Sequence, residues 1–391
     1  MEDLIKDSKY IQNLLENDSL NDEEIIKQFP TINFYLLKAY YNGKQMKSDD
    51  NLLKIAEYMN YLNCGRLEEV LIKIKHKHNF KWYQSLNEDL IKEIEIELNK
   101  ITQIACTYNY SVALRKDGSI ISFCEDEIDI LPPKINDKKY IKIACYGHYL
   151  AGLSSDCVAM YDDKIDFKDG EYTTIACGYD HVAAIRKDGT LVTWGKPRKN
   201  SITHVDCIDV KCGYSHTVVL KKDGTIAMYN EMSGDQREGM PTNGGYKEIA
   251  CGSYHSVALH NDGSIVTWGS NDEYQLENCP SSTKIGEYIA IACGDYHSVA
   301  LRSDGSVVTW GDTGWDQEYD SPTGNGYIAI ACGQHHSVAL HSNGSVTIWG
   351  SNDYDQRDNC PKDNGYIAIA CGCYHSMALK NDGTVTIWGG Y

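Results

Sequence analysis

Histidine and cysteine recur at fixed spacing through residues 101–391, and they are the side chains best suited to chemistry. A cysteine marks each of eight units: Cys106, Cys145, Cys177, Cys212, Cys251, Cys293, Cys332 and Cys371. Four residues later, six units carry a histidine: His181, His216, His255, His297, His336 and His375. Imidazoles and thiols are common zinc ligands. Because each histidine holds the same position once per unit, the spacing favours a repeated structural role, and we predict no metal and no other cofactor.

The element that must position each histidine is a short antiparallel sheet. In the most regular unit, apolar runs at 288–293, 297–301 and 307–310 predict three strands. Asp304-Gly305 separates the last two runs, and this pair is a strong hairpin signal because glycine adopts positive φ without penalty. Seven of the eight units have glycine at this position, twelve residues after the cysteine. One such sheet cannot bury both faces, whereas a ring of sheets can, so the repeat predicts a β-propeller.

An aromatic residue follows seventeen residues after most of the cysteines, and in five units it is tryptophan: Trp194, Trp268, Trp310, Trp349 and Trp388. We expect these rings to fill the space between neighbouring blades. The second unit departs from the pattern, since Cys157 replaces the turn glycine and Asp162 replaces the aromatic residue. We therefore expect the second blade to be irregular.

The string Ile-Ala-Cys-Gly-x-x-His-Ser-x-Ala-Leu, followed by Asp-Gly and then Trp-Gly, resembles the repeat of the regulator of chromosome condensation family. Trp268-Gly269-Ser270-Asn271, running on to Gln275-Leu276, is similar to a further mark of that family. The resemblance implies that the histidines brace the inner strands through hydrogen bonds. Members usually have seven blades. The eight units here favour eight blades of three strands, like compact bacterial β-lactamase inhibitor propellers, with seven as the alternative.

Residues 1–100 differ in pattern from the repeats and predict a small all-α domain. Leu67, Val70, Leu71 and Ile74 follow the spacing of one helix face. The segments 40–59 and 64–77 resemble the latter half of BTB/POZ domains, which implies an adaptor role. The alternative is a simple helical cap on the propeller. Self-association through these helices is left open.

The charge of the chain points to a protein partner and away from nucleic acid. The formal net charge is −18, whereas phosphate binding needs a basic surface. Residues 231–391 hold 7 Lys+Arg against 20 Asp+Glu, so a basic partner would suit this part, although a merely solvated surface is the alternative. The candidate contacts lie in the loops between units: Tyr274, Gln275, Leu276, Trp315, Asp316, Gln317, Tyr319, Tyr354 and Gln356.

The sequence favours a non-enzymatic recognition scaffold over the other function classes. It has no Gly-rich phosphate loop, G-x-S-x-G or H-E-x-x-H motif, so we expect no enzyme. No apolar run approaches the roughly 20 residues of a membrane span, and the start does not resemble a signal peptide. We therefore expect an intracellular, cytoplasmic protein.

Two alternatives to this function stay open. One is a structural or assembly protein of a large virus, in the host cytoplasm or the virion, since 28 Tyr against 5 Phe suggests an AT-rich genome. There, Cys279 and Cys360 could form disulfides between chains. The less favoured alternative is a small-GTPase exchange regulator, the best-known activity in the family that the repeats resemble. That activity needs an inserted wedge, for which the longest step between cysteines, 42 residues, leaves no obvious room.

Overall fold

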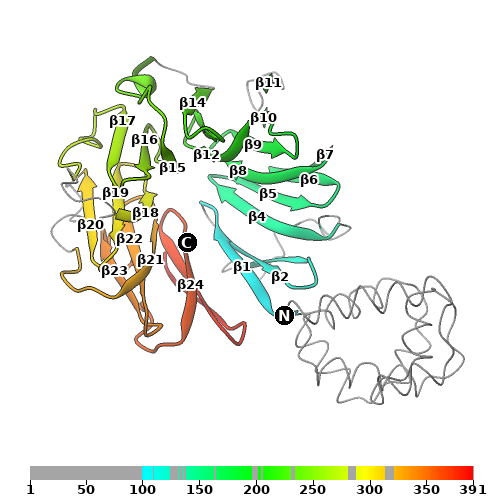
Figure 1. The fold of residues 1–391 in the computed structure, drawn as a ribbon. Helices are drawn as coiled ribbons and strands as arrows, with labels where there is room; N and C mark the ends of the chain where they lie inside the picture. Colours follow the sequence, from blue (N-terminus) through cyan, green and yellow to red (C-terminus); the bar gives the residue numbers. More distant parts are fainter. Residues whose placement is uncertain are drawn as a thin grey trace, which may run out of the picture. The chain divides into compact units, whose positions relative to one another are not determined.

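The computed structural model describes residues 99–390 except 109, 124–130, 132–134, 136–137, 163, 196–200, 204–205, 230–233, 281–287 and 313–320. The predicted helical domain and its BTB-like segments lie outside the described residues. The described part belongs to one unit, Asn99–Tyr391 (Figure 1). Within it, no helix has the length and apolar character needed to cross a bilayer.

The described strands form eight antiparallel sheets that follow one another along the chain. The first four sheets are β1 (Ile101–Cys106), β2 (Ser111–Arg115) and β3 (Ile120–Phe123); β4 (Tyr140–Tyr146), β5 (Tyr149–Ser154), β6 (Cys157–Asp162) and β7 (Lys164–Asp169); β8 (Tyr172–Cys177), β9 (His181–Arg186), β10 (Leu191–Gly195) and β11 (Ser201–Thr203); β12 (Cys207–Cys212), β13 (Thr217–Lys221) and β14 (Ile226–Tyr229). The last four are β15 (Tyr246–Cys251), β16 (His255–His260) and β17 (Ile265–Gly269); β18 (Tyr288–Cys293), β19 (His297–Arg302) and β20 (Val307–Gly311); β21 (Tyr327–Cys332), β22 (His336–His341) and β23 (Val346–Gly350); β24 (Tyr366–Cys371), β25 (His375–Lys380) and β26 (Val385–Gly389). A short 3-10 helix, η2 (Gly234–Arg237), precedes β15.

The hairpin in each unit forms where the Asp-Gly or Asn-Gly signal predicts it. In the sixth sheet, Gly305 has a φ of +81° and its N–H donates to the carbonyl of Arg302 at 2.9 Å. The Asp304 carboxylate accepts the N–H of Ser306 at 2.8 Å, which closes the turn from the side. The seven repeat glycines all have φ between +79° and +88°. The predicted turns are therefore confirmed.

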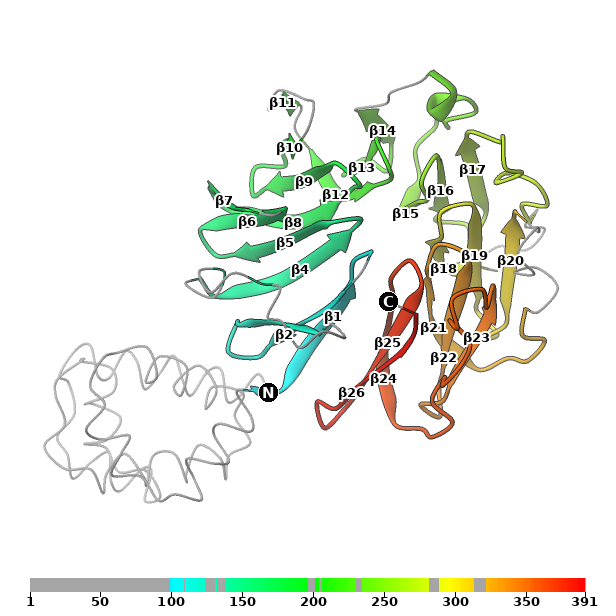
Figure 2. The same ribbon diagram turned by 180° about the vertical axis from the view of Figure 1, so that it is seen from behind.

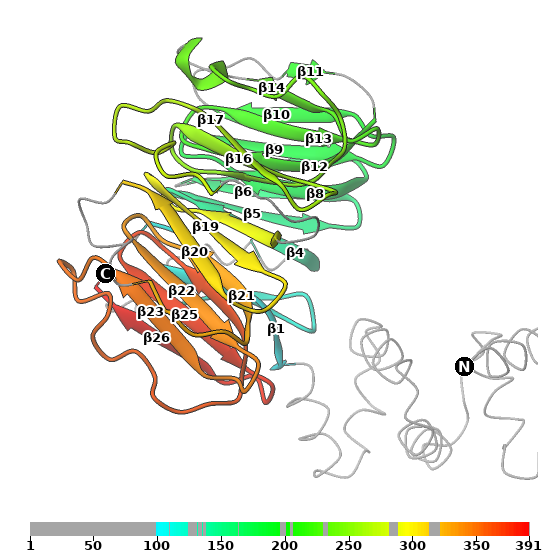
Figure 3. The ribbon, with the colours of Figure 1, turned by 60° about the vertical axis from the view of Figure 1, so that its left-hand side comes forward.

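The sheets stack in order, and the last meets the first. The inner strands, which are the first strands of the eight sheets, contact one another in succession, and β24 contacts β1. Figures 1 and 2 show β1 beside β24 from opposite sides, and Figure 3 shows successive sheets layered face to face. The described chain is thus an all-β repeat structure of propeller type.

Two sheets depart from the three strands that we expected. In the second sheet β6 pairs with β7, and in the third β10 pairs with β11, so each has four strands. The prediction of uniformly three-stranded blades was wrong for these two sheets. The reason is that the chain leaving β6 and β10 folds back in an extended conformation along the outer strand, where hydrogen bonds complete the unpaired edge.

The core lies between neighbouring sheets. Trp310, 1% exposed, packs against Val257 and Leu259 of the preceding sheet. Trp268 and Trp349 occupy the same position at their own junctions and are equally buried. Trp194 and Trp388 are also buried against the preceding sheet. Large aromatic side chains thus fill the gaps between sheets, in the place expected from the repeat.

Candidate functional site

Each histidine of the repeat joins its own sheet to the next one. His297 Nε2 lies 2.7 Å from Ser337 Oγ, and both side chains are fully buried. The same contact recurs at 2.8–2.9 Å in five other pairs: His181–Thr217, His216–Ser256, His255–Ser298, His336–Ser376 and His375–Ser111. The last pair connects the eighth sheet to the first. The histidines therefore brace the inner part of the structure from sheet to sheet; the sequence resemblance implied bracing of the inner strands without specifying which sheets are joined.

The hydroxyl in each pair also contacts the repeat cysteine of its own sheet. Ser337 Oγ donates to Cys332 Sγ at 3.7 Å, so the hydroxyl is free to accept the Nε2–H of His297. This pattern requires neutral histidine protonated at Nε2. Burial lowers the pKa of His297 and His336 to about 3 and that of His255 to about 4. Burial likewise raises the pKa of the Cys332 thiol to about 12.

The two units without histidine also lack the matching hydroxyl. Tyr110 and Tyr149 stand in the histidine position of the first and second sheets. The facing positions in the following sheets hold Leu150 and Val182 instead of serine or threonine. A buried imidazole or hydroxyl left without its partner would cost about 1–3 kcal/mol. Both members of a pair are thus present together or absent together. In the described part of the chain, no group of three or more His, Cys, Asp or Glu side chains could hold a metal ion.

The turns that follow the inner strands bring one aromatic ring from each sheet to the same end of the ring of sheets. These are Tyr108, His148, Tyr179, Tyr214, Tyr254, Tyr296, His335 and Tyr374. Most neighbouring rings contact one another: Tyr179 and Tyr214 stack with centroids 4.2 Å apart, and Tyr296 and His335 stack at 5.5 Å. The hydroxyls of Tyr108 and Tyr374 lie 2.9 Å apart, which links the first and last sheets. We call these eight residues the aromatic crown.

A cavity of about 370 Å³ lies among the crown residues and the repeat cysteines. Tyr146 of the second sheet reaches across it, and its hydroxyl lies 3.0 Å from Ser253 Oγ and donates to Asp295 Oδ1 at 3.0 Å. The third to eighth sheets have glycine where Tyr146 stands. At Gly294 a Cβ would lie 2.3 Å from His297 Cε1 and 2.4 Å from the carbonyl of Gly333, so no larger residue fits there. Tyr146 therefore partly fills a space that the glycines keep open.

Acidic groups gather around one side of the crown. Burial raises the pKa of Asp295, and the hydroxyl of Tyr146 opposes this by donating to the carboxylate. Burial, and then the negative charges of Asp295, Glu273 and Asp312, raise the pKa of Tyr296 to about 12. Burial lowers the pKa of His335, so its ring does not supply a compensating charge at neutral pH. This side of the crown suits a positively charged ligand.

Two of the candidate loop residues present exposed rings. Tyr274 is 63% exposed and Tyr354 is 52% exposed. The ring of Tyr354 packs 4.1 Å from that of the crown residue Tyr374, so this loop and the crown share one surface. Leu276 is half-buried. The remaining candidate loop residues, Trp315, Asp316, Gln317 and Tyr319, lie outside the described residues.

The interpretation of Gln275 and Gln356 as partner contacts was wrong. Both side chains are buried, and their Oε1 atoms accept the backbone N–H groups of Glu273 at 3.0 Å and Tyr354 at 2.9 Å. The loops have no strand partner here, so a buried amide satisfies backbone groups that would otherwise be unpaired. The regular spacing of the glutamines reflects loop folding. Gln236 is also buried, and its Nε2 donates to Ser215 Oγ.

The two loop cysteines are poorly suited to reaction. Cys279 and Cys360 are half-buried against the clusters between sheets, and both are free thiols. Burial raises the pKa of each thiol to about 11. At neutral pH they are therefore almost wholly protonated, and the thiol is the unreactive form.

The sequence-based prediction missed the crown, Tyr146 and Asp295. A usable signal existed, because an aromatic residue stands two or three residues after the repeat cysteine in every unit. The offset from the cysteine is two residues in the first, third and fourth units and three residues in the others, which hides the position in a simple alignment on the cysteine. The pairing of Tyr146 with Asp295 spans 149 residues and has no local signal.

Comparison with known proteins supports the repeat assignment. The family model for the regulator of chromosome condensation (RCC1) repeat matches residues 172–200, 246–275, 288–314 and 327–356, which lie in four of the eight units. No curated protein matches the sequence.

Solved structures resemble the described fold at low sequence identity. The CRINKLY WD40 ectodomain of the Arabidopsis thaliana receptor kinase ACR4 is 18% identical over 64% of this chain and 95% of that chain, with a TM-score of 0.52. Prp20p from Saccharomyces cerevisiae, described with its binding to Gsp1p and histones, is 16% identical over 74% and 82%, with a TM-score of 0.46. The computationally designed Ika8 protein is 18% identical over 75% and 96%, with a TM-score of 0.46. The chain thus carries RCC1 repeats in a fold of propeller type.

Proposed function

We propose that this protein is a non-enzymatic recognition scaffold that binds a protein partner through its axial face. The axial face comprises the aromatic crown, Tyr274 and Tyr354. In this proposal the eight sheets are the blades of an eight-bladed ring. Residues 1–98 connect it to a second component, as an adaptor would, and the protein acts inside the cell. Rigid scaffolds commonly carry binding residues on the loops at one end.

The backbone of Tyr274 is the observation that carries this proposal. Tyr274 has a φ of +59° and an exposed side chain. The equivalent residue in the loop after β23 is Asp355, with a φ of +56°. Aspartate tolerates this left-handed conformation, whereas for a bulky residue it is an outlier that costs of order 1–3 kcal/mol. An exposed ring recovers none of that cost by packing, so contact with a partner is the physical reason to retain tyrosine here.

The negative charge beside the crown favours a partner with a basic surface. Asp295, Glu273 and Asp312 surround Tyr296, so a basic protein surface would be attracted to this side. Charges at a rim mainly raise the association rate, whereas buried aromatic anchors determine how long a complex lasts. We therefore expect association to slow as salt rises from about 50 to 500 mM, with little change in dissociation.

The test is affinity capture from the native host with the full chain and three variants. Tyr274→Asn and Tyr354→Ala remove the exposed rings. Glu171→Gln changes an exposed carboxylate before β8, at the opposite end of the inner strands, and serves as the control.

Proteins retained by the wild type and by Glu171→Gln, but lost with Tyr274→Asn and Tyr354→Ala, would support the proposal. Loss of either ring should weaken the binding of a purified partner by about 2 kcal/mol, as for an interface hot spot. Partners that tolerate both substitutions and bind at a salt-independent rate would show that another surface is used.

A further inference from the structure

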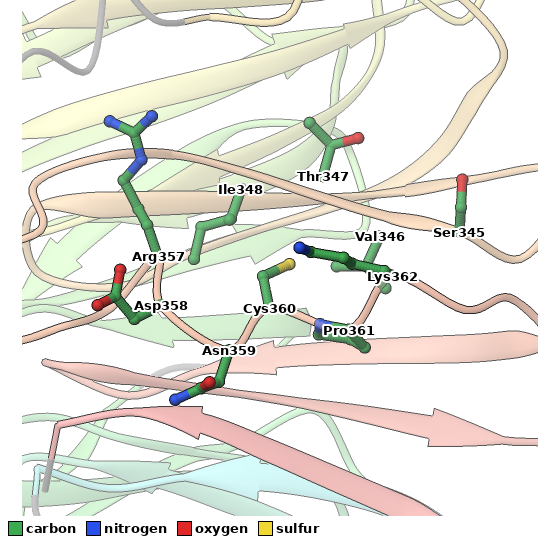
Figure 4. Close-up of a pocket in the computed structure, with 10 residues that line it drawn as sticks. All are labelled: Ser345, Val346, Thr347, Ile348, Arg357, Asp358, Asn359, Cys360, Pro361 and Lys362. Atoms are coloured by element: carbon green, nitrogen blue, oxygen red, sulfur yellow. The ribbon is translucent and has the colours of Figure 1, made fainter.

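The outer edge of the seventh sheet lies open along a groove of about 710 Å³. Val346, Thr347 and Ile348 of β23 form one wall, and the loop 357–362 forms the other. Figure 4 shows the Cys360 side chain extending from the loop into the space between the loop and β23, with the Lys362 side chain drawn beside it. Among the described strands, β23 pairs only with β22, so its other edge has no strand partner; the third strands of five other sheets share this feature, and at β23 the edge lies along the groove.

In the third sheet, this same edge is filled by the chain itself. Counted from the repeat tryptophan, Val346, Thr347 and Ile348 correspond to residues 191–193 of β10. The three residues of β11 pair with those positions: Leu191 with Thr203, Val192 with Ile202, and Thr193 with Ser201. In the second sheet, β7 likewise pairs with residues 159–161, which are the equivalents in β6. The groove thus exposes the positions that a fourth strand covers elsewhere in this protein.

The chain that follows β23 cannot supply this fourth strand. Pro361 has no N–H to donate to a ladder. Asp355 and Asn359 have φ values of +56° and +58°, which are incompatible with an extended strand. The buried Gln356 fixes the loop by accepting the N–H of Tyr354. The loop therefore passes beside β23 and leaves its edge open.

The groups available on this edge follow from the hairpin register. The N–H of His341 donates to the carbonyl of Ser345 at 2.9 Å, and Thr347 lies opposite Ala339. Hydrogen bonds of an antiparallel pair involve alternate residues, so Thr347 continues the ladder to β22. The backbone N–H and C=O groups of Val346 and Ile348 then point outward. An unpaired edge of this kind is a template for another strand.

We propose that β23 binds an extended segment of a partner protein, which adds as a fourth strand to the seventh sheet. Its backbone pairs with Val346 and Ile348, as β11 pairs with β10. Val346, Ile348 and Cys360 all pack against the same hydrophobic cluster. A β-branched or small apolar side chain in the incoming strand would extend that packing. This site is separate from the axial face, and the inference does not depend on the proposed function.

The probe is a library of random decapeptides displayed on phage and selected against the full chain. Selected peptides are then synthesised and measured against wild type and Ile348→Pro. Proline at 348 removes an outward N–H and leaves the ladder to β22 intact. Thr193→Pro, at the corresponding position of β10 where β11 already pairs, is the matched control. We expect at least a tenfold loss of affinity in Ile348→Pro and little change in Thr193→Pro.

Two measurements on the wild type keep the test decisive if a proline variant fails to fold. A bound peptide should slow hydrogen exchange at the amides of Val346 and Ile348 at least tenfold. It should also slow the alkylation of Cys360, measured at about pH 9 because burial raises the pKa of this thiol. Cys279 holds the equivalent position beside β17, whose outer edge is also unpaired, and its alkylation shows whether the peptide binds that edge as well. Failure to select any peptide, or selected peptides that protect neither the amides nor Cys360, would overturn the proposal. Protection that rises with protein concentration alone would also overturn it, by identifying a second copy of the chain as the occupant.

Discussion

Exchanging the His297–Ser337 pair for an apolar pair tests whether the two side chains act as one unit. His297 Nε2 and Ser337 Oγ lie 2.7 Å apart, with no exposure of either side chain. Ser337→Val leaves the imidazole N–H without an acceptor, and we expect a loss of about 2–3 kcal/mol in the free energy of unfolding. His297→Leu leaves a hydroxyl that still donates to Cys332 Sγ. Its expected cost is smaller, about 1–2 kcal/mol.

The double variant reproduces the apolar facing position that Val182 provides between the second and third sheets. Because neither buried polar group then lacks a partner, we expect the double variant to lose at least about 1 kcal/mol less than the sum of the single losses. Urea unfolding followed by tryptophan fluorescence measures all four proteins. The control combines His297→Leu with Ser376→Val, whose partner is His336, and should be additive. A coupling below about 0.5 kcal/mol for His297–Ser337 would refute the reasoning.

Three further predictions concern stability and the loop backbone. The buried histidines have folded pKa values of about 3 to 4, below the roughly 6.5 of the unfolded chain, so stability is complete above about pH 6.5 and is lost as pH falls toward 4. Each contributes a slope of about 1.4 kcal/mol per pH unit, and circular dichroism should show unfolding between about pH 5.5 and 4, whereas a stable fold at pH 3.5 would contradict this. Trp310→Ala should lower the free energy of unfolding by about 3–5 kcal/mol. A loss below about 1 kcal/mol, measured by chemical denaturation, would mean that the ring is not a core element. Tyr274→Asn should raise stability by about 1 kcal/mol because asparagine tolerates positive φ, and an unchanged or lower melting temperature would argue against strain at this residue.

The sequence determined the repeated parts of the structure. Asp-Gly signals placed the hairpins because only a few residue types take positive φ without cost, and Gly305 adopts the predicted turn. The regular tryptophans were predicted between sheets, since a large ring in a fixed position needs a fixed cavity. The sequence also favoured a structural role for the histidines through their repetition alone. These features depend on residues that are close together in the chain, or on a pattern that repeats at a nearly constant separation.

The tertiary structure decided everything that depends on contacts between different units. Only the closed arrangement shows that each histidine bonds to the next sheet, and that His375 meets Ser111 across 264 residues. The burial of Gln275 and the exposure of Tyr274, its neighbour in sequence, follow from how the loop folds over its own backbone. The aromatic crown forms because eight separate turns converge. The edge of β23 is open because the loop after it does not pair, as is also the case in the five other described sheets that have three strands. The spacing of residues in the sequence predicts neither the convergence of the turns nor the unpaired edge of β23, because both depend on distances between residues far apart in the chain.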